Sequence, residues 1–208
     1  MLNIAVLVSG GGTNLGALLK AEREGQIKNG KITKVISSRP DAYALERAKS
    51  YGVPTAVVDR RAIGDPQKFD DAVYDELEKA GADLIVLAGF MYILSERISK
   101  RYENKIINVH PALIPSFCGP GYYGLRVHEA ALKAGVKITG ATVHFVNEVA
   151  DGGPIILQGA VEVKRGDTPE TLQKRVMEEA EWKLLPKAVS LICEGRVELI
   201  NGRAYVKE

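Results

Sequence analysis

The chain has 208 residues, 46% of them hydrophobic, with 28 basic and 26 acidic side chains and a net charge of +2. This nearly balanced charge offers no field for a polyanion such as tRNA, so it favours small-molecule substrates over nucleic acid. Two distant cysteines give no disulfide framework, no apolar run approaches the roughly 18 residues of a membrane span, and the first residues lack the order of a signal peptide. A cytoplasmic location is therefore expected.

The first half of the chain predicts alternating strands and helices. Apolar runs typical of strands occur at 3–8, 32–37, 53–58, 84–88 and 105–109, separated by helical patterns at about 13–25, 41–51, 66–80 and 95–101. Repeated βα units predict a Rossmann-like α/β fold, with a mainly parallel twisted sheet and helices on both faces. Ligands of such folds bind beyond the carboxyl ends of the strands.

A glycine-rich loop, Ser-Gly-Gly-Gly-Thr-Asn at 9–14, joins the first expected strand to the first helix. Glycines let the backbone approach a ligand closely, the helix N-terminus offers free N–H groups, and Thr13 and Asn14 add side-chain donors. We therefore expect a phosphate to bind here, although a turn that merely packs is the alternative. The loop matches neither a P-loop nor a clean dinucleotide fingerprint, and no acidic residue ends the second strand, which disfavours ATP and NAD.

The second half of the chain departs from this alternation. Residues 140–161 predict two strands joined by a loop at 147–153, which indicates an antiparallel pair added to the sheet. Thr168 is a good helix N-cap before a proline, and apolar residues at helical spacing continue to about residue 192. Pro186 lies inside this stretch and is expected to bend or split the helix.

The last predicted element is a hairpin at 197–206, because Asn201-Gly202 between two apolar runs is the strongest short hairpin signal. This hairpin and the preceding pair of strands form an antiparallel C-terminal extension of the fold. No repeat, low-complexity tract or interdomain linker interrupts the chain. We therefore predict a single domain at 1–208, composed of a phosphate-binding half at 1–110 and a second half at 111–208.

Three polar residues fall where strands are expected to end. Asn108 and His110 are two residues apart in an extended run, so their side chains point to the same side. Asp151 follows a second strand-like run and precedes a Gly-Gly-Pro turn. An amide can donate to an oxygen that gains negative charge, an imidazole can move a proton near neutral pH, and a carboxylate can orient that imidazole. The three together suit attack on a carbonyl through a tetrahedral intermediate.

Other interpretations stay open on these residues alone. A single His or Asp at a strand end is more often a turn or surface residue than a catalyst. Residues 37–39, Ser-Ser-Arg, could bind the extra phosphate of NADP, although an oxidoreductase would leave Asn108, His110 and Asp151 without a role. The three histidines and two cysteines show no metal-ligand spacing, so no metal is expected.

Over nearly its whole length the sequence resembles phosphoribosylglycinamide formyltransferase, the folate-dependent enzyme of purine synthesis. The resemblance is carried by LVSGGGTNL at 7–15, LAGFMYILS at 87–95, NVHPALIP at 108–115 and ADGGPIILQ at 150–158. The last two segments are typical of a wider group that includes methionyl-tRNA formyltransferase and formyltetrahydrofolate hydrolase. Members of those two types carry an additional C-terminal or N-terminal domain, for which this length leaves no room, so we expect the ribonucleotide enzyme.

The resemblance implies transfer of the formyl group of 10-formyltetrahydrofolate to the amino group of glycinamide ribonucleotide, in de novo purine (IMP) biosynthesis. Asn108 and His110 would stabilise the oxyanion, while Asp151 would raise the pKa of His110 and position a water that moves the proton. The enzyme would be a monomer or homodimer acting on small molecules, without nucleic acid or membrane. Alternatives are a formyltetrahydrofolate hydrolase and a non-catalytic phosphate-binding module.

The resemblance also assigns binding residues. Folate contacts are implied for Met91, Tyr92, Ile93, Leu94, Asn108, Asn147, Glu148, Val149, Ala150 and Asp151. Ribonucleotide contacts are implied for Gly12, Thr13 and Asn14 at the phosphate and for Glu178 and Glu181 near the amino group. The alternatives are that residues 90–94 are simply core and that the glutamates form a solvated helix face.

Some residues depart from the family pattern. Tyr92 lies where many members have Arg, and Trp182 lies where members often have His. The loop at 116–124 is longer than the common family loop after the His-Pro segment, so we expect a different lid, which Tyr122 and Tyr123 could close over the substrates.

Three further residues receive no role in the chemistry. Cys118 is a possible reactive thiol that the reaction does not need. His128 and His144 are interpreted as possible polar core groups and are not predicted to be catalytic.

Overall fold

The structure is a computed structural model that describes residues 1–207, and its internal contacts divide the chain into two compact units, Met1–Ile107 and Asn108–Glu208. The boundary falls inside strand β5 (Ile106–His110), which contributes residues to both units. Within the described residues, no helix combines the length and the apolar character that crossing a bilayer requires.

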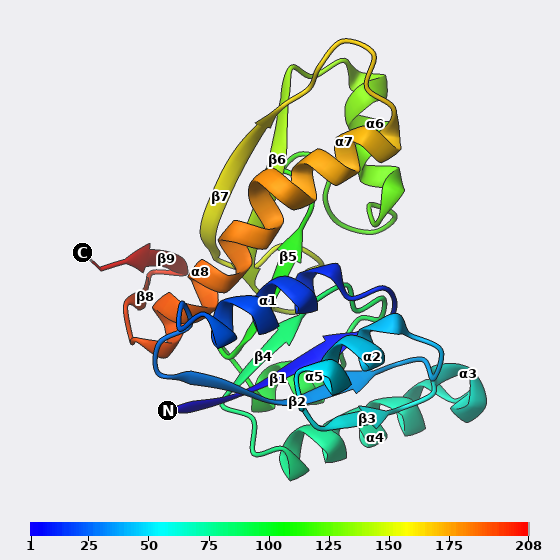
Figure 1. The fold of residues 1–208 in the computed structure, drawn as a ribbon, viewed down its shortest axis with the longest axis vertical. Helices are drawn as coiled ribbons and strands as arrows, with labels where there is room; N and C mark the ends of the chain where they lie inside the picture. Colours follow the sequence, from blue (N-terminus) through cyan, green and yellow to red (C-terminus); the bar gives the residue numbers. More distant parts are fainter. Residues whose placement is uncertain (208) are drawn as a thin grey trace. The chain divides into compact units, whose positions relative to one another are not determined.

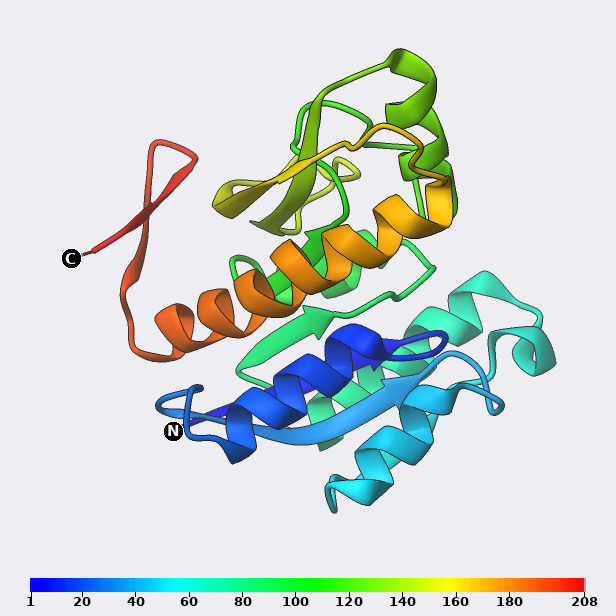
Figure 2. The same cartoon turned by 45° about the horizontal axis from the view of Figure 1, so that its top comes forward.

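The first unit consists of alternating strands and helices. In chain order these are β1 (Leu2–Val8), α1 (Thr13–Arg23), β2 (Gly30–Ser37), α2 (Tyr43–Ser50), β3 (Thr55–Val57), α3 (Arg60–Ile63), α4 (Pro66–Lys79), β4 (Leu84–Leu87), α5 (Glu96–Arg101) and the start of β5. Helices α1 and α2 cover one face of these strands and α4 and α5 the other, as right-handed crossovers require (Figures 1 and 2).

Strand β1 is the centre of the first unit. It pairs in parallel with β2 on one side and β4 on the other. A parallel strand covered on both faces needs a continuous apolar run, and residues 4–8 of β1 are completely buried. The sequence runs from this buried strand directly into the glycine-rich loop, so the loop leaves the sheet at the carboxyl end of its central strand.

The predicted helices and strands of the first unit are confirmed, with differences around β3. This strand covers only residues 55–57 rather than 53–58, and α3 was not predicted. Asp59 accepts hydrogen bonds from the backbone N–H groups of Arg61 and Ala62, and this cap starts α3. A helix of four residues is too short to produce a hydrophobic period, so the sequence pattern could not reveal it.

The second unit begins within β5 and continues with one helix, two long strands, a long helical run and a hairpin. Its elements are α6 (Leu125–Ala134), β6 (Ile138–Phe145), β7 (Ile155–Glu162), α7 (Pro169–Val176), the π-helical turn η1 (Met177–Glu181), α8 (Trp182–Cys193), β8 (Val197–Ile200) and β9 (Arg203–Val206). The run of α7, η1 and α8 lies against β6 and β7 (Figures 1 and 2).

The strand order confirms the predicted fold class. The sheet has seven strands in the order β3-β2-β1-β4-β5-β6-β7, with β6 and β7 antiparallel. The predicted hairpin is confirmed as a separate two-stranded sheet of β8 and β9. The chain is thus a mainly parallel α/β protein with an antiparallel C-terminal extension.

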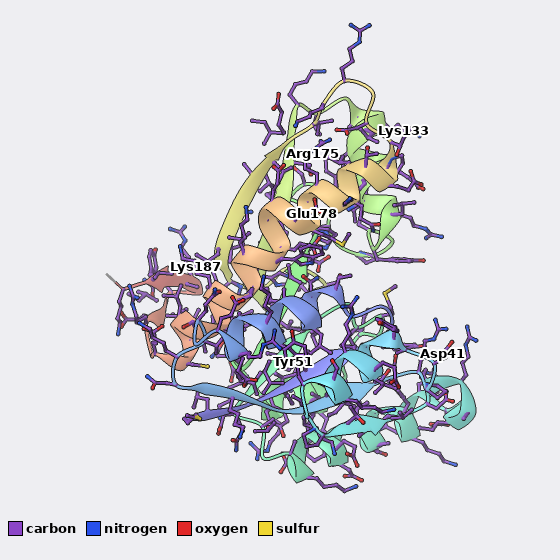
Figure 3. All side chains as sticks on the ribbon, viewed as in Figure 1. Asp41, Tyr51, Lys133, Arg175, Glu178 and Lys187 are labelled. Atoms are coloured by element: carbon purple, nitrogen blue, oxygen red, sulfur yellow. The ribbon has the colours of Figure 1, made fainter. Side chains whose placement is uncertain are left out.

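The sequence predicted a bend or break of the long helical run at Pro186, but the irregular turn of the run is the π turn at 177–181, which precedes this proline. Pro186 lies inside α8, which continues past it to Cys193. The π turn at 177–181 ends shortly before this proline, and the run passes through both Arg175 and Glu178 (Figure 3). A proline removes the hydrogen bond to the carbonyl four residues earlier, so its effect falls in the turn that precedes it.

Candidate active site

Strand β5 presents two of the predicted catalytic side chains. Asn108 and His110 alternate with buried Val109, as a pleated strand requires, and the imidazole of His110 is almost completely buried. The strand ends at His110 because the next residue, Pro111, has no N–H for a ladder bond. Both side chains therefore leave the strand at its carboxyl end, where the α/β fold exposes ligand sites.

Asp151 reaches these two residues from the loop between β6 and β7. Its Oδ2 atom lies 3.5 Å from Nδ1 of His110, and its Oδ1 atom accepts a long hydrogen bond of 3.5 Å from Nδ2 of Asn108. The loop needs its glycines, since a Cβ atom on Gly153 would stand 1.8 Å from the carbonyl oxygen of Phe145. The structure thus brings together Asn108, His110 and Asp151, as the sequence predicted.

A fourth side chain, His144 on β6, joins this group. Its Nε2 atom lies 3.3 Å from Nδ2 of Asn108 and 3.6 Å from Oδ1 of Asp151, and the imidazole is 2% exposed. Sequence reasoning left it as a polar core group. One signal was present: on strand β6, His144 lies two residues after Thr142, another buried polar side chain.

Burial and hydrogen bonds shift the protonation of Asp151 and His110. Burial disfavours the charged form of Asp151, but the adjacent imidazole of His144, the hydrogen bond from the Gly119 N–H and the nearby His110 still hold the pKa of Asp151 below its ordinary value. Burial also lowers the pKa of His110, and the carboxylate of Asp151 opposes this change. The predicted effect of Asp151, which is to raise the pKa of His110, is present, but burial outweighs it and the net pKa of His110 is lowered.

The loop at 116–124 contacts the same group through its backbone. Nε2 of His110 donates to the carbonyl oxygen of Phe117 at 2.8 Å, and the N–H of Gly119 donates to Oδ2 of Asp151 at 2.9 Å. Phe117 adopts the left-handed conformation, with φ at 50°. The rings of Tyr122 and Tyr123 are exposed. The loop therefore contacts the predicted catalytic residues His110 and Asp151 through main-chain atoms, whereas the sequence had indicated contacts from its tyrosines.

In the first unit, the glycine-rich loop is held against α2. The N–H of Ala44 donates to the carbonyl oxygen of Gly10, and Nε of Arg47 donates to that of Gly11 at 2.8 Å. Gly12 has φ at 67°, and a Cβ atom there would stand 2.6 Å from Cβ of Ala44. Only glycine fits this position, after which Thr13 begins α1.

Residues 91–94 of the first unit are not uniformly core. Met91 is 54% and Ile93 87% exposed, whereas Leu94 is buried. The ring of Tyr92 packs with those of Phe69 and Phe90, and the guanidinium of Arg60 lies over two of these three rings. The segment therefore offers exposed apolar side chains on an aromatic base.

This segment is tied to the start of the glycine-rich loop. The N–H of Met91 donates to Oγ of Ser9 at 3.0 Å, and that hydroxyl lies 2.7 Å from Oγ of Ser38. Buried Ser9 therefore links the ends of strands β1, β2 and β4.

The remaining predicted binding residues lie in the second unit. Residues 147–150 are exposed in the loop before Asp151, where Oδ1 of Asn147 accepts from the N–H of Val149. Glu178 and Glu181 differ in solvent exposure. Glu178 is exposed, whereas Glu181, also within the π turn, is 6% exposed. The interpretation of all the glutamates as a solvated face is therefore wrong for Glu181, because the π turn changes the face on which a side chain emerges.

Across residues 1–207, no group of three or more His, Cys, Asp or Glu side chains is arranged to hold a metal ion. Both cysteines of the described chain are free thiols, and burial together with Asp151 raises the pKa of the Cys118 thiol. A raised pKa keeps a thiol protonated and unreactive near neutral pH.

Comparison with known proteins identifies the class to which this fold and site belong. The profile of the formyl transferase family (Formyl_trans_N) matches residues 2–189. The chain belongs to the formyl transferase family, and within it to the phosphoribosylglycinamide formyltransferases, as its relatives show. It is 42% identical over 206 residues to the phosphoribosylglycinamide formyltransferase of Haemophilus influenzae, covering 99% of this chain and 94% of that protein.

Solved structures agree with this assignment. Glycinamide ribonucleotide transformylase 1 from Symbiobacterium toebii has a TM-score of 0.93 and 43% identity, covering 100% of this chain and 95% of that chain. The human trifunctional purine biosynthetic protein adenosine-3 is 44% identical over 207 residues, 99% of this chain. The chain spans about a fifth of the length of such trifunctional relatives. The predicted resemblance to phosphoribosylglycinamide formyltransferase is confirmed by these matches.

Proposed function

We propose that the chain transfers the formyl group of 10-formyltetrahydrofolate to the amino group of glycinamide ribonucleotide, yielding formylglycinamide ribonucleotide and tetrahydrofolate. The observation that carries this proposal is the cluster of half-buried Asn108, buried His110 and half-buried Asp151, in a chain similar over its full length to named phosphoribosylglycinamide formyltransferases. An amide, an imidazole and a carboxylate at one strand end suit acyl transfer through a tetrahedral intermediate.

The proposed reaction makes one C–N bond and breaks another. The ribonucleotide amine attacks the formyl carbon, and the formyl oxygen becomes an oxyanion that accepts hydrogen bonds from Asn108 and His110. A water held by the ionised carboxylate of Asp151 takes the proton from the attacking nitrogen and delivers it to the departing folate nitrogen. The lowered pKa of Asp151 supports this role, because a carboxylate that stays charged can orient water throughout the cycle.

The environment of His110 supports a role as hydrogen-bond donor. The carbonyl oxygen of Phe117 can only accept, so Nε2 of His110 carries a proton in this structure. Burial favours the neutral imidazole of His110. Negative charge developing on a substrate oxygen would instead favour the charged imidazolium. His110 would therefore donate most strongly when the oxyanion forms, which is the requirement for catalysis.

For the ribonucleotide, we propose that Gly12, Thr13 and Asn14 bind the phosphate. Support comes from the position of these residues at the N-terminus of the 11-residue helix α1, where backbone N–H groups face an anion. Glu178 and Glu181 would receive the cationic or polar end that carries the amine. The burial of Glu181 favours it over exposed Glu178 for a specific contact.

For the folate, we propose an apolar slot formed by residues 91–94 of the first unit, and we propose separately that the loop residues 147–151 of the second unit bind it. Exposed Met91 and Ile93 offer apolar surface for a flat ring. Tyr92 replaces the arginine common in the family, and the nearby guanidinium of Arg60 offers a positive charge at this segment. Leu94 is buried and would support the slot from beneath without touching the ligand.

The test is an absorbance assay for loss of the formyl group from 10-formyltetrahydrofolate, run with and without glycinamide ribonucleotide. We expect turnover that requires the ribonucleotide and collapses in His110→Ala, with Lys133→Ala on the exposed surface of α6 as the matched control. Turnover that survives in His110→Ala would contradict the proposed site.

A second candidate is a formyltetrahydrofolate hydrolase, which would use water in place of the amine. It is favoured by the structure of a formyltetrahydrofolate deformylase from Pseudomonas syringae, with a TM-score of 0.88 and 26% identity, of which this chain covers 66%. Formate release without ribonucleotide would identify this activity. A cytoplasmic monomer or homodimer remains our prediction for either enzyme.

A further inference from the structure

His144 forms a closed triangle with two of the proposed catalytic side chains. The separations are 3.3 Å from Nε2 of His144 to Nδ2 of Asn108, 3.5 Å from that nitrogen to Oδ1 of Asp151, and 3.6 Å from Oδ1 back to Nε2. All three residues belong to the second unit. None of the roles assigned above uses His144.

The other ring nitrogen fixes the tautomer of His144. Nδ1 lies 2.7 Å from the carbonyl oxygen of Phe145, and a carbonyl can only accept, so Nδ1 carries the proton. In the neutral imidazole Nε2 is then a bare acceptor. The strand supports this orientation, because the pairing of β6 with β7 shifts register between Val143 and His144, and such bulges re-aim side chains next to active sites.

The triangle therefore contains two acceptors and one donor. Nε2 of His144 and Oδ1 of Asp151 both accept, and only the amide nitrogen of Asn108 can donate to them. Because the three separations are nearly equal, the two acceptors lie about 60° apart as seen from Nδ2, whereas the two N–H bonds of an amide diverge by about 120°. One N–H directed between the two acceptors can therefore serve both, which leaves the second N–H free to point out of the triangle.

We propose that His144 is a positioning residue that orients the amide of Asn108 and so aims its second N–H at the oxyanion. Without the imidazole acceptor, the amide could rotate and present its carbonyl oxygen to a developing negative charge. Donors held in place before the reaction stabilise an oxyanion most, since no reorganisation is needed as charge develops. This inference rests on the proposed role of Asn108.

Two substitutions of His144 distinguish the contact made by Nε2 from the contact made by Nδ1. In His144→Gln the longer side chain can place an amide oxygen where Nε2 was, so it can still accept from Asn108. In His144→Asn the shorter side chain can keep the bond to the Phe145 carbonyl but cannot reach Asn108. We expect kcat to fall roughly 10- to 100-fold in His144→Asn and less than about 5-fold in His144→Gln, with KM for both substrates changed less than about 3-fold, since this is the loss of part of one oxyanion contact.

A double-mutant cycle tests whether the effect acts through Asn108. In an Asn108→Ala background there is no amide to orient, so adding His144→Asn should change kcat less than about 3-fold. Losses that multiply, or equal losses in the Gln and Asn variants, would overturn the inference and indicate a merely structural role. An unchanged kcat in Asn108→Ala alone would instead contradict the proposed function of Asn108.

A measurement on the wild-type protein keeps the inference testable if a variant fails to fold. The ¹⁵N chemical shifts of the His144 ring report which nitrogen carries the proton. We expect the proton on Nδ1, an Nε2 that accepts a hydrogen bond, and an Nε2 shift that changes in Asn108→Ala. A proton on Nε2 in the wild-type protein would rule out its role as the acceptor.

Discussion

At the scale of single residues, the proposed active group depends on both the presence and the direction of the Asn108 amide. Asn108 is half-buried, and its Nδ2 atom is its point of contact with both His144 and Asp151. An aspartate at this position would keep the size of the side chain but replace the donor with a negative charge. Mutation can therefore separate the size of the side chain from its ability to donate a hydrogen bond.

We predict that Asn108→Ala lowers kcat about 100- to 1,000-fold, the usual effect of losing one oxyanion donor. Asn108→Asp should lower kcat at least as much, since a carboxylate repels the oxyanion, while KM for each substrate changes little in either variant. Steady-state kinetics with each substrate varied in turn checks this. A kcat within about 3-fold of wild type in Asn108→Ala would exclude the donor role.

The glycine-rich loop shows that its three glycines are not equivalent. Gly12 combines a positive φ with a Cβ position 2.6 Å from Ala44, whereas Gly10 has open space around the corresponding point. We predict that Gly12→Ala destabilises the protein by roughly 1–3 kcal/mol through strain and overpacking, and raises KM for the ribonucleotide. Gly10→Ala is the matched control.

Thermal unfolding of the two variants measures the difference. We expect a lower Tm for Gly12→Ala and a Tm close to wild type for Gly10→Ala. Equal Tm values would mean that the contact with α2 does not constrain the loop.

At the scale of elements, helix α7 begins at a buried ion pair. Asp167 accepts two hydrogen bonds of 2.6 Å from the guanidinium of Arg175 and one of 2.7 Å from the N–H of Lys164. The Arg175 guanidinium holds the pKa of Asp167 far below its usual range. Thr168, the next residue, caps the helix with a reciprocal bond to Thr171. The start of the long helical run is therefore fixed by charge as well as by its cap.

We predict that Asp167→Asn destabilises the protein by roughly 2–3 kcal/mol, because it weakens charge-assisted bonds and leaves Arg175 without its partner. Glu46→Gln, which breaks an exposed pair with Lys49, is the control and should change stability by less than about 0.5 kcal/mol. Urea unfolding of both variants gives the comparison. Equal effects would show that burial of the pair contributes nothing.

The same elements show what sequence alone can and cannot predict. The βα alternation, the β6–β7 pair, the α7 cap and the hairpin all follow from local patterns and were confirmed by the structure. Local reasoning also placed Asn108, His110 and Asp151 at strand and loop ends, and they do meet. The sequence did not predict the place of His144 in this group or the main-chain contacts of Phe117 and Gly119. These features depend on which strands lie side by side and on the conformation of the loop.

The net direction of the pKa shift of His110 could not be predicted for a related reason. A nearby carboxylate can be inferred from a motif, whereas the degree of burial depends on every element packed around the site. Here burial dominates. The π turn at Met177–Glu181 could not be predicted either, because one extra residue in a turn leaves no local pattern in the sequence.

At the scale of the whole molecule, buried histidines make stability depend on pH. His128 on α6 is completely buried, neither ring nitrogen has a hydrogen-bond partner within the described structure, and burial lowers its pKa to about 4. The unfolded chain takes up this proton at about pH 6.5, and the folded chain only near pH 4. Between these values the unfolded state binds more protons, so folding stability falls as the pH falls.

We predict that the wild-type protein loses stability as the pH falls from 6.5 towards 4, and that His128→Leu loses less over the same interval. At 1.36 kcal/mol per pKa unit, the contribution of His128 is roughly 3 kcal/mol. Urea unfolding of both proteins at pH 7.5 and pH 5 checks this. Parallel pH dependence of the two proteins would show that His128 does not titrate as inferred.

The π turn also sets the phase of the helix that follows it. A π-helical bond spans five residues instead of four, so this turn contains one residue more than a regular helix would need. Deleting one residue there would restore an unbroken α-helix, yet it would rotate everything beyond it by about 100°. Either the apolar face of α8 or the inward direction of Glu181 would then be lost. The extra residue thus allows a packing face and a buried carboxyl group to coexist on one continuous rod.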